Sequence, residues 1–175
     1  MSIKYLVEPL SGAKHRRAEF SCEEQELTEF LQQRALAEME ARASACFVLV
    51  PETDSGRIAG FYTLSAATIS LAKLPLDLTA GLPQYPNLPA TLLGRLARDQ
   101  NWRGSGLGDL LLTSALSRAL GGTASVGSVA VVTDPKNSKA RAFYRRHGFR
   151  DLGAGRRMFL LMAEIAACLH EGGLA

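Results

Sequence analysis

The segment LLGRLARDQNWRGSGLGDLLL, which covers residues 92–112, constrains the fold more than any other part of the chain. An apolar run ends in the glycine-rich loop RGSGLG, and this loop leads directly into an amphipathic helix. Because glycine has no Cβ, the backbone of such a loop can approach a ligand closely and turn successive N–H groups toward it. The N-terminus of the helix adds unpaired N–H groups and a partial positive charge. The segment therefore predicts a strand–loop–helix junction that binds phosphate.

The hydrophobic pattern of the 175 residues predicts one domain, residues 1–175, of the α/β (α+β) class. Ser21–Glu24 has the sequence of a capping box, and the helix that follows it is expected to end near Arg42. Residues 70–90 contain four prolines and are expected to form a loop, which at this length is more often functional than idle. Further helices are expected at 108–120 and 137–147, and strands at 46–50, 58–69, 91–98, 126–133, 149–152 and 157–162.

The N-terminal sequence MSIKYLVEPL does not have the pattern of a signal peptide, because Lys4 and Glu8 interrupt its apolar residues. No apolar stretch in the sequence is long enough to span a bilayer. The three cysteines, Cys22, Cys46 and Cys168, lack CxxC spacing and are expected to be reduced thiols. These features together predict a cytoplasmic protein.

Positive charge is concentrated in the C-terminal part of the chain. Residues 136–157 contain two lysines and six arginines, with Asp151 as the one acid among them. Such a run suits a polyanionic partner, and it equally suits a solvated basic helix face. Both interpretations stay open at this point.

Several chemistries of glycine-rich loops are excluded by the residues around this one. A P-loop needs a lysine after its glycines, and none follows here. The dinucleotide pattern GxGxxG has Asp109 or Leu111 where its third glycine belongs, depending on where it starts. Neither GxSxG nor HExxH is present, and the three histidines lack metal-ligand spacing. The sequence therefore predicts no metal site.

Two motifs, which follow one another along the chain, resemble motifs of the GCN5-related N-acetyltransferase (GNAT) superfamily. The first is [Q/R]xxGx[G/A], with Arg103, Gly106 and Gly108, and the second is AxxFYxxxGF over residues 140–149. The resemblance covers nearly the whole chain and implies acetyl-coenzyme A as cosubstrate. It also implies a mixed central sheet of six to seven strands that splays at the coenzyme cleft, flanked by about four helices.

The resemblance assigns roles to individual residues. The strand end Leu96, Ala97 and Arg98 would pair with the pantetheine arm. Tyr144 is the expected general acid, because a phenol with a pKa near about 10 stays protonated at neutral pH. Adjacent helix positions cannot face the same way, so Phe143 is expected in the core and Tyr144 in the cleft, the alternative being a core role for Tyr144. The residues whose N–H groups would hold the diphosphate are Arg103, Gly104, Ser105, Gly106, Leu107 and Gly108.

Asn137 has two possible roles, which are a contact to the pantetheine and a cap on the helix that follows it. Either role suits a side-chain amide at that position. The sequence does not choose between them.

The run LGRLA over residues 93–97, followed by Asp99, is similar to that of the toxin acetyltransferases of bacterial toxin–antitoxin pairs. This narrower resemblance implies acetylation of the α-amine of aminoacyl-tRNA, a small DNA-binding antitoxin as partner, and a homodimer. Where those toxins usually have valine, this chain has Arg98. The candidate substrate contacts are Arg95, Arg98, Arg141 and Arg145.

Two other functions remain possible on the sequence. One is acetyl transfer to a small-molecule amine or to a protein N-terminus. The other is a non-catalytic module that binds coenzyme A, which a buried Tyr144 would favour.

Overall fold

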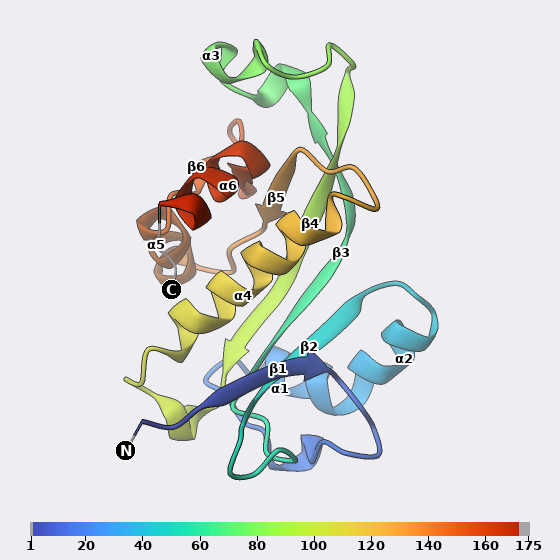
Figure 1. Ribbon diagram of the computed structural model, residues 1–175, viewed down its shortest axis with the longest axis vertical. Coiled ribbons are helices and arrows are strands. Elements are labelled where there is room, and N and C mark those ends of the chain that lie inside the picture. Colours follow the sequence, from blue (N-terminus) through green and yellow to red (C-terminus); the bar gives the residue numbers. More distant parts are fainter. Residues whose placement is uncertain (1, 172–175) are drawn as a thin grey trace. The chain divides into compact units, whose positions relative to one another are not determined.

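The structure, a computed structural model, describes residues 2–171 and contains a seven-stranded mixed sheet with the strand order β1-β2-β3-β4-β5-β7-β6 (Figure 1). The strands are β1 (Tyr5–Pro9), β2 (Ala45–Pro51), β3 (Gly60–Ser70), β4 (Asn87–Arg98), β5 (Ala130–Thr133), β6 (Arg150–Asp151) and β7 (Met158–Leu161). The helices are α1 (Gln25–Glu29), α2 (Ala35–Glu40), α3 (Leu76–Thr79), α4 (Leu107–Gly122), α5 (Ser138–Arg146) and α6 (Met162–His170). The predicted α/β class and the predicted number of strands are confirmed.

A π-helical segment, Phe30–Arg34, joins α1 to α2 into one helix, so residues 2–171 contain five α-helices where the resemblance implied about four. Within residues 2–171, no helix has both the length and the apolar character needed to cross a membrane. By its internal contacts the chain divides into two compact units. One comprises residues up to Ser65 with Gly94–Ala115, and the other comprises Ala66–Leu93 with the residues from Leu116 onward.

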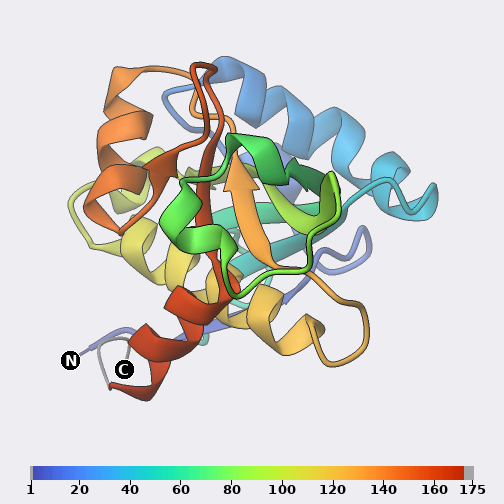
Figure 2. The ribbon, with the colours of Figure 1, turned by 90° about the horizontal axis from the view of Figure 1, so that it is seen from above.

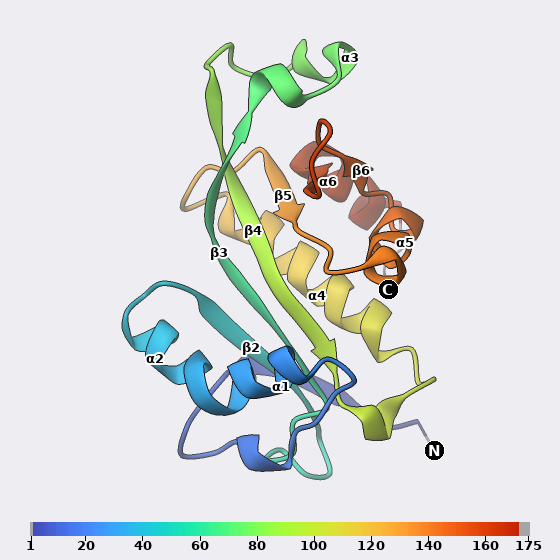
Figure 3. The same ribbon diagram turned by 180° about the vertical axis from the view of Figure 1, so that it is seen from behind.

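In the first unit, the helix formed by α1, the π-helical segment and α2 packs against β2 and β3 (Figure 3). Its apolar residues recur at helical spacing, and Phe30, Leu31 and Ala35 are completely buried against these strands. The ring of Phe61 on β3 packs between those of Phe20 and Phe30, with centroids 5.4 and 6.1 Å away. A continuous apolar stripe along this helix therefore supplies the core of the unit.

The predicted capping box at Ser21–Glu24 is wrong. The helix begins at Gln25 with Glu24 at its N-cap, and no side chain caps it. The backbone N–H of Ser21 instead donates to the Asp99 carboxylate, at 3.0 Å. The capping sequence was misleading because a distant buried acid competes for this part of the chain.

The second unit is built around β5, whose four residues are all buried. β5 pairs in parallel with β4 through Thr91–Val131 and Leu92–Val132, and antiparallel with β7. The helices α5 and α6 lie beside β5, whereas the α3 segment lies at the far end of β3 and β4 (Figure 1 and Figure 2). The buried core residues of this unit are Ile69, Leu74, Leu88, Ala90, Ala130, Val132, Leu152, Phe159 and Leu161.

Several element boundaries differ from the prediction, and two elements were not predicted. β5 begins at Ala130 rather than 126, and Val126 lies 75% exposed before it. The 70–90 loop is shorter than expected, because β3 continues to Ser70 and β4 begins at Asn87. β1 was not predicted, since its edge position leaves all five residues partly or fully exposed and its pattern weak. The helix α6 was also not predicted.

Candidate functional site

The glycine loop lies between the end of β4 and the start of α4. Gly104 and Gly106 have φ angles of 75° and 78°, which side chains with a Cβ rarely adopt. The N–H groups of Arg103 and Ser105 are used within the loop, where they donate to the carbonyls of Gln100 and Trp102. As in any helix, the first N–H groups of α4 have no acceptor inside the helix. Within residues 2–171, the donors that remain for an anion are therefore those of Gly104, Gly106 and the residues of α4 before Leu110, whose N–H donates to the Gly106 carbonyl.

Asp99 holds the chain in place just before this loop. Its side chain is fully buried and accepts hydrogen bonds from the N–H groups of Asn101 and Ser21, at 2.9 and 3.0 Å. Arg57 lies 3.5 Å from the same carboxylate. The sequence motif contains Asp99 but does not reveal this role, because its partners Ser21 and Arg57 come from distant parts of the chain.

The strand end before the loop alternates between two environments, as expected for β4. Ala97 is buried in the core of the first unit. Arg95 lies on the same face, with its guanidinium 3.7 Å from the centroid of the Phe30 ring and 3.8 Å from the Glu38 carboxylate. On the other face, the Nε of Arg98 is buried and has no hydrogen-bond partner among residues 2–171. Arg95 is thus occupied by packing, whereas Arg98 keeps an unused donor.

Tyr144 lies on α5, in the second unit, and only 7% of it is exposed. Its hydroxyl is hydrogen-bonded to the Thr133 hydroxyl, and burial raises its pKa to about 12. Thr133 donates its own proton to the carbonyl of Leu93, at 2.9 Å, so Tyr144 is the donor in the bond with Thr133. Leu93 follows the last residue pair of the β4–β5 ladder. The phenol is therefore fixed at the end of this parallel ladder.

The predicted orientation of the neighbouring aromatics is wrong. Phe143 is half-buried and packs edge-on against His147, with ring centroids 4.9 Å apart. Tyr144 is the buried residue, because its ring packs against Phe149 in the turn after the helix, at 5.3 Å. A buried Tyr144 is what a non-catalytic module would show. The Tyr144 hydroxyl nevertheless lies at the end of the β4–β5 ladder. This hydroxyl keeps its proton at neutral pH, as a general acid requires.

Asn137 caps α5, and its side chain accepts a hydrogen bond from the N–H of Ala140 at 2.9 Å. The capping role is therefore confirmed. A contact to the pantetheine stays a prediction.

Acidic side chains partly neutralise the basic run of residues 136–157. The candidate substrate contacts Arg141 and Arg145 both form ion pairs with Asp151. Arg150 pairs with Glu164, an acid outside the run. Arg141 and Arg145 are consequently less available to a polyanion than the sequence suggested.

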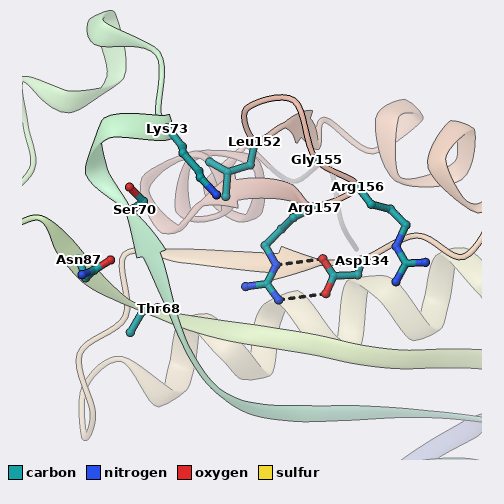
Figure 4. Close-up of a pocket in the computed structure, with 9 residues that line it drawn as sticks. All are labelled: Thr68, Ser70, Lys73, Asn87, Asp134, Leu152, Gly155, Arg156 and Arg157. Atoms are coloured by element: carbon teal, nitrogen blue, oxygen red, sulfur yellow. Dashed lines mark hydrogen bonds and ion pairs between the residues drawn. The ribbon is translucent and has the colours of Figure 1, made fainter.

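A pocket of about 460 Å³ lies in the second unit (Figure 4). Arg157 binds Asp134 on its wall through two hydrogen bonds of 2.9 and 3.0 Å, and this holds the pKa of the Asp134 carboxyl below its ordinary value. Among residues 2–171, no group of three His, Cys, Asp or Glu side chains could hold a metal ion. The pocket is lined by Thr68, Ser70, Lys73, Asn87, Asp134, Leu152, Gly155, Arg156 and Arg157.

Comparison with known proteins gives concordant relatives. Residues 42–151 match the family described as Acetyltransferase (GNAT) domain. The probable toxin TacT of Sinorhizobium fredii is 32% identical over 174 residues, which cover 95% of this chain and 96% of that protein. A protein of Mycobacterium tuberculosis called tRNA-acetylating toxin is 35% identical over 130 residues, which cover 74% of this chain and 75% of that protein.

Solved structures of related toxins have the same fold. AtaT complexed with acetyl-methionyl-tRNAfMet superposes with a TM-score of 0.87 at 26% identity, over 95% of this chain and 99% of that one. AtaTR bound with AcCoA gives a TM-score of 0.82 at 26% identity, over 94% and 98% of the two chains. The glycine loop and these relatives agree: the chain belongs to the GNAT acetyltransferase family, within the group of toxins that includes TacT.

Proposed function

We propose that this protein transfers the acetyl group of acetyl-coenzyme A to the α-amine of aminoacyl-tRNA and so blocks translation. The observation that carries the proposal is the similarity to two toxins, one along nearly the whole chain and one called a tRNA-acetylating toxin. The solved structure of AtaT with acetyl-methionyl-tRNA supports the same acceptor class. The proposal treats residues 1–175 as one catalytic domain that works in the cytoplasm, where charged tRNA is found.

The glycine loop fits the diphosphate of the coenzyme. The positive φ angles of Gly104 and Gly106 shape a turn with no side-chain atoms at these positions. In the proposal, the N–H groups of this turn and of the first turn of α4 hold the diphosphate, and the Leu96–Arg98 backbone pairs with the pantetheine. When bound, acetyl-coenzyme A supplies a thioester that a neutral amine can attack.

Tyr144 performs the proton transfer in this proposal. Because its pKa is about 12, the phenol is protonated at neutral pH and can give its proton to the sulfur that leaves. Thr133 holds the phenol oxygen in place until then, since Thr133 is itself fixed to the Leu93 carbonyl. The chain thus provides a positioned acid, while the acceptor amine must arrive uncharged.

A toxin of this kind needs a partner that restrains it. We therefore propose a small DNA-binding antitoxin as the partner and a homodimer as the assembly. Size measurement of the purified toxin, alone and co-expressed with its antitoxin, tests both.

Incubation with acetyl-coenzyme A and charged tRNA tests the proposed reaction. We expect mass spectrometry of the nuclease-digested product to find N-acetyl-aminoacyl-adenosine. Deacylated tRNA is the control and should remain unmodified. Acetylation of small amines or of peptide N-termini, with none on charged tRNA, would assign the enzyme to a different acceptor.

A further inference from the structure

The Lys73–Arg157 pocket, lined as described above, has no role in the proposed reaction so far. None of the residues expected to bind the coenzyme, namely Leu96–Arg98, Arg103–Gly108 and Asn137, lines it. Its lining includes Asp134, the residue directly after Thr133, which is bonded to the proposed acid. The pocket therefore begins one residue away from the contact that fixes Tyr144.

Two cations of this pocket, Lys73 and Arg156, form no direct ion pair within residues 2–171, although the charge of Arg156 helps to lower the pKa of the Asp134 carboxyl. Within the described part of the chain, the side chains of Lys73 and Arg156 form neither a hydrogen bond nor an ion pair, unlike most arginines of the basic run. The aliphatic part of Lys73 lies beside Gly153, so closely that a Cβ at this glycine would be 3.7 Å from it. This contact supports the stem of Lys73 and leaves its ammonium group for a ligand.

Arg157 offers a third donor to the pocket. Its Nε and Nη2 bind the two oxygens of Asp134, and the remaining nitrogen points away from Asp134 (Figure 4). Because the bidentate pair fixes the guanidinium plane, the direction of this third nitrogen is fixed as well. With Asp134 included, the pocket still carries an excess of positive charge.

The uncharged polar groups of the pocket narrow the class of ligand. The hydroxyls of Thr68 and Ser70 and the amide of Asn87 lie on the wall formed by β3 and β4. Lysine and arginine together with threonine, serine and asparagine are the side chains that commonly contact phosphate and ribose. A volume of about 460 Å³ also suits a ligand as small as a single nucleotide.

We infer that this pocket binds the phosphate and ribose of a nucleotide near the 3′ end of the acceptor RNA, with Lys73 and Arg156 as the phosphate contacts. The inference rests on the proposed function and adds the residues that recognise the RNA. It differs from the sequence expectation, which placed the substrate contacts at Arg141 and Arg145. Those two arginines are both ion-paired to Asp151, whereas within residues 2–171 neither Lys73 nor Arg156 forms a direct ion pair, and the acid nearest in charge to Arg156, Asp134, is already bound by Arg157.

Binding of an uncharged tRNA acceptor minihelix tests the inference without requiring catalysis. The variants are Lys73→Gln, Arg156→Gln and the double variant, and Lys4→Gln is the control because it removes an exposed charge outside the pocket. We expect the double variant to raise the Kd for the minihelix roughly tenfold. Each single variant should raise this Kd by less. The slope of log Kd against log salt concentration should fall by about 0.7 for each lost contact. The Kd for acetyl-coenzyme A should not change.

Three results would overturn the inference. The first is a minihelix Kd of the double variant that equals the Kd of the Lys4→Gln control. The second is a matching loss of acetyl-coenzyme A affinity, which would assign the pocket to the coenzyme. The third is that the variants weaken binding of the antitoxin and leave binding of the minihelix unchanged. If the minihelix result holds while charged tRNA is not acetylated, the proposed function fails and the RNA site stands.

Discussion

At the scale of single residues, the acid strength of one phenol decides whether the proposed reaction can proceed at neutral pH. Burial disfavours the charged form of Tyr144 and raises its pKa to about 12. The side chain therefore keeps a proton under all physiological conditions. Its bond to Thr133 also keeps the oxygen in one place, which reduces the cost of orienting the acid.

Tyr144→Phe removes the proton donor and keeps the ring. We expect kcat to fall by about 10²-fold or more, because general acid catalysis typically contributes that much. The Kd for acetyl-coenzyme A, measured by calorimetry, should stay within about twofold of wild type, since no described contact of Tyr144 involves the glycine loop. Full activity of this variant would remove Tyr144 from the mechanism.

The pH dependence of kcat/KM follows from the same pKa. Activity should rise as the α-amine of the acceptor loses its proton, near its ordinary pKa of about 8. Because the phenol is protonated until the pH approaches about 12, no fall from loss of the acid should occur between pH 6 and pH 9. Initial rates on charged tRNA over this range check the profile. A descending limb with a midpoint below pH 9 would contradict the assignment.

Asp99 is the residue whose loss should cost the most stability near the site. Asp99→Ala leaves the N–H of Ser21 and the guanidinium of Arg57 without their buried acceptor. The free energy of unfolding in urea should fall by about 2–4 kcal/mol. Asp77→Ala, at an exposed position in α3, is the control and should change it by less than about 0.5 kcal/mol. Equal effects of the two variants would show that the Asp99 bonds contribute little.

At the scale of elements, the junction of β4 and α4 depends on backbone conformations that glycine alone adopts easily. Gly106→Val forces a β-branched residue to a φ of 78°. We expect acetyl-coenzyme A binding to be lost, with the far-ultraviolet circular dichroism retained. Gly127→Val is the matched control, because Gly127 has open space around it and no positive φ. Unchanged coenzyme affinity in Gly106→Val would place the diphosphate elsewhere.

The elements that could be predicted from the sequence are those whose own residues show a strong pattern of spacing or capping. The helices α4 and α5 were placed within two residues of their observed starts, because helical spacing and the Asn137 cap are local signals. The glycine loop was also recognised from adjacent residues. The strand β1 was missed, since an edge strand buries too little to show an alternating pattern.

Features that depend on contacts between distant residues could not be predicted in this way. The reversed orientation of Phe143 and Tyr144 depends on Phe149, which lies beyond the end of the helix. The ion pairs that occupy Arg141 and Arg145, and the pocket around Lys73, combine segments far apart in sequence. Such pairings are set by tertiary packing rather than by local composition.

At the scale of the whole molecule, the chain forms two compact units, and each has its own core. The first unit holds the glycine loop and the second holds Tyr144 and the Lys73–Arg157 pocket. β3 and β4 contribute residues to both units. The residues of each unit come from separate stretches of the sequence.

The central claim is acetyl transfer to the α-amine of charged tRNA, and a competition assay tests it most directly. Radiolabelled acetyl-coenzyme A is offered to the protein together with aminoacyl-tRNA, the same free amino acid and a peptide with that residue at its N-terminus. We expect the label on aminoacyl-tRNA for the wild type, and at least about 10²-fold less for Tyr144→Phe. Label on the free amino acid or the peptide, with none on tRNA, would contradict the account.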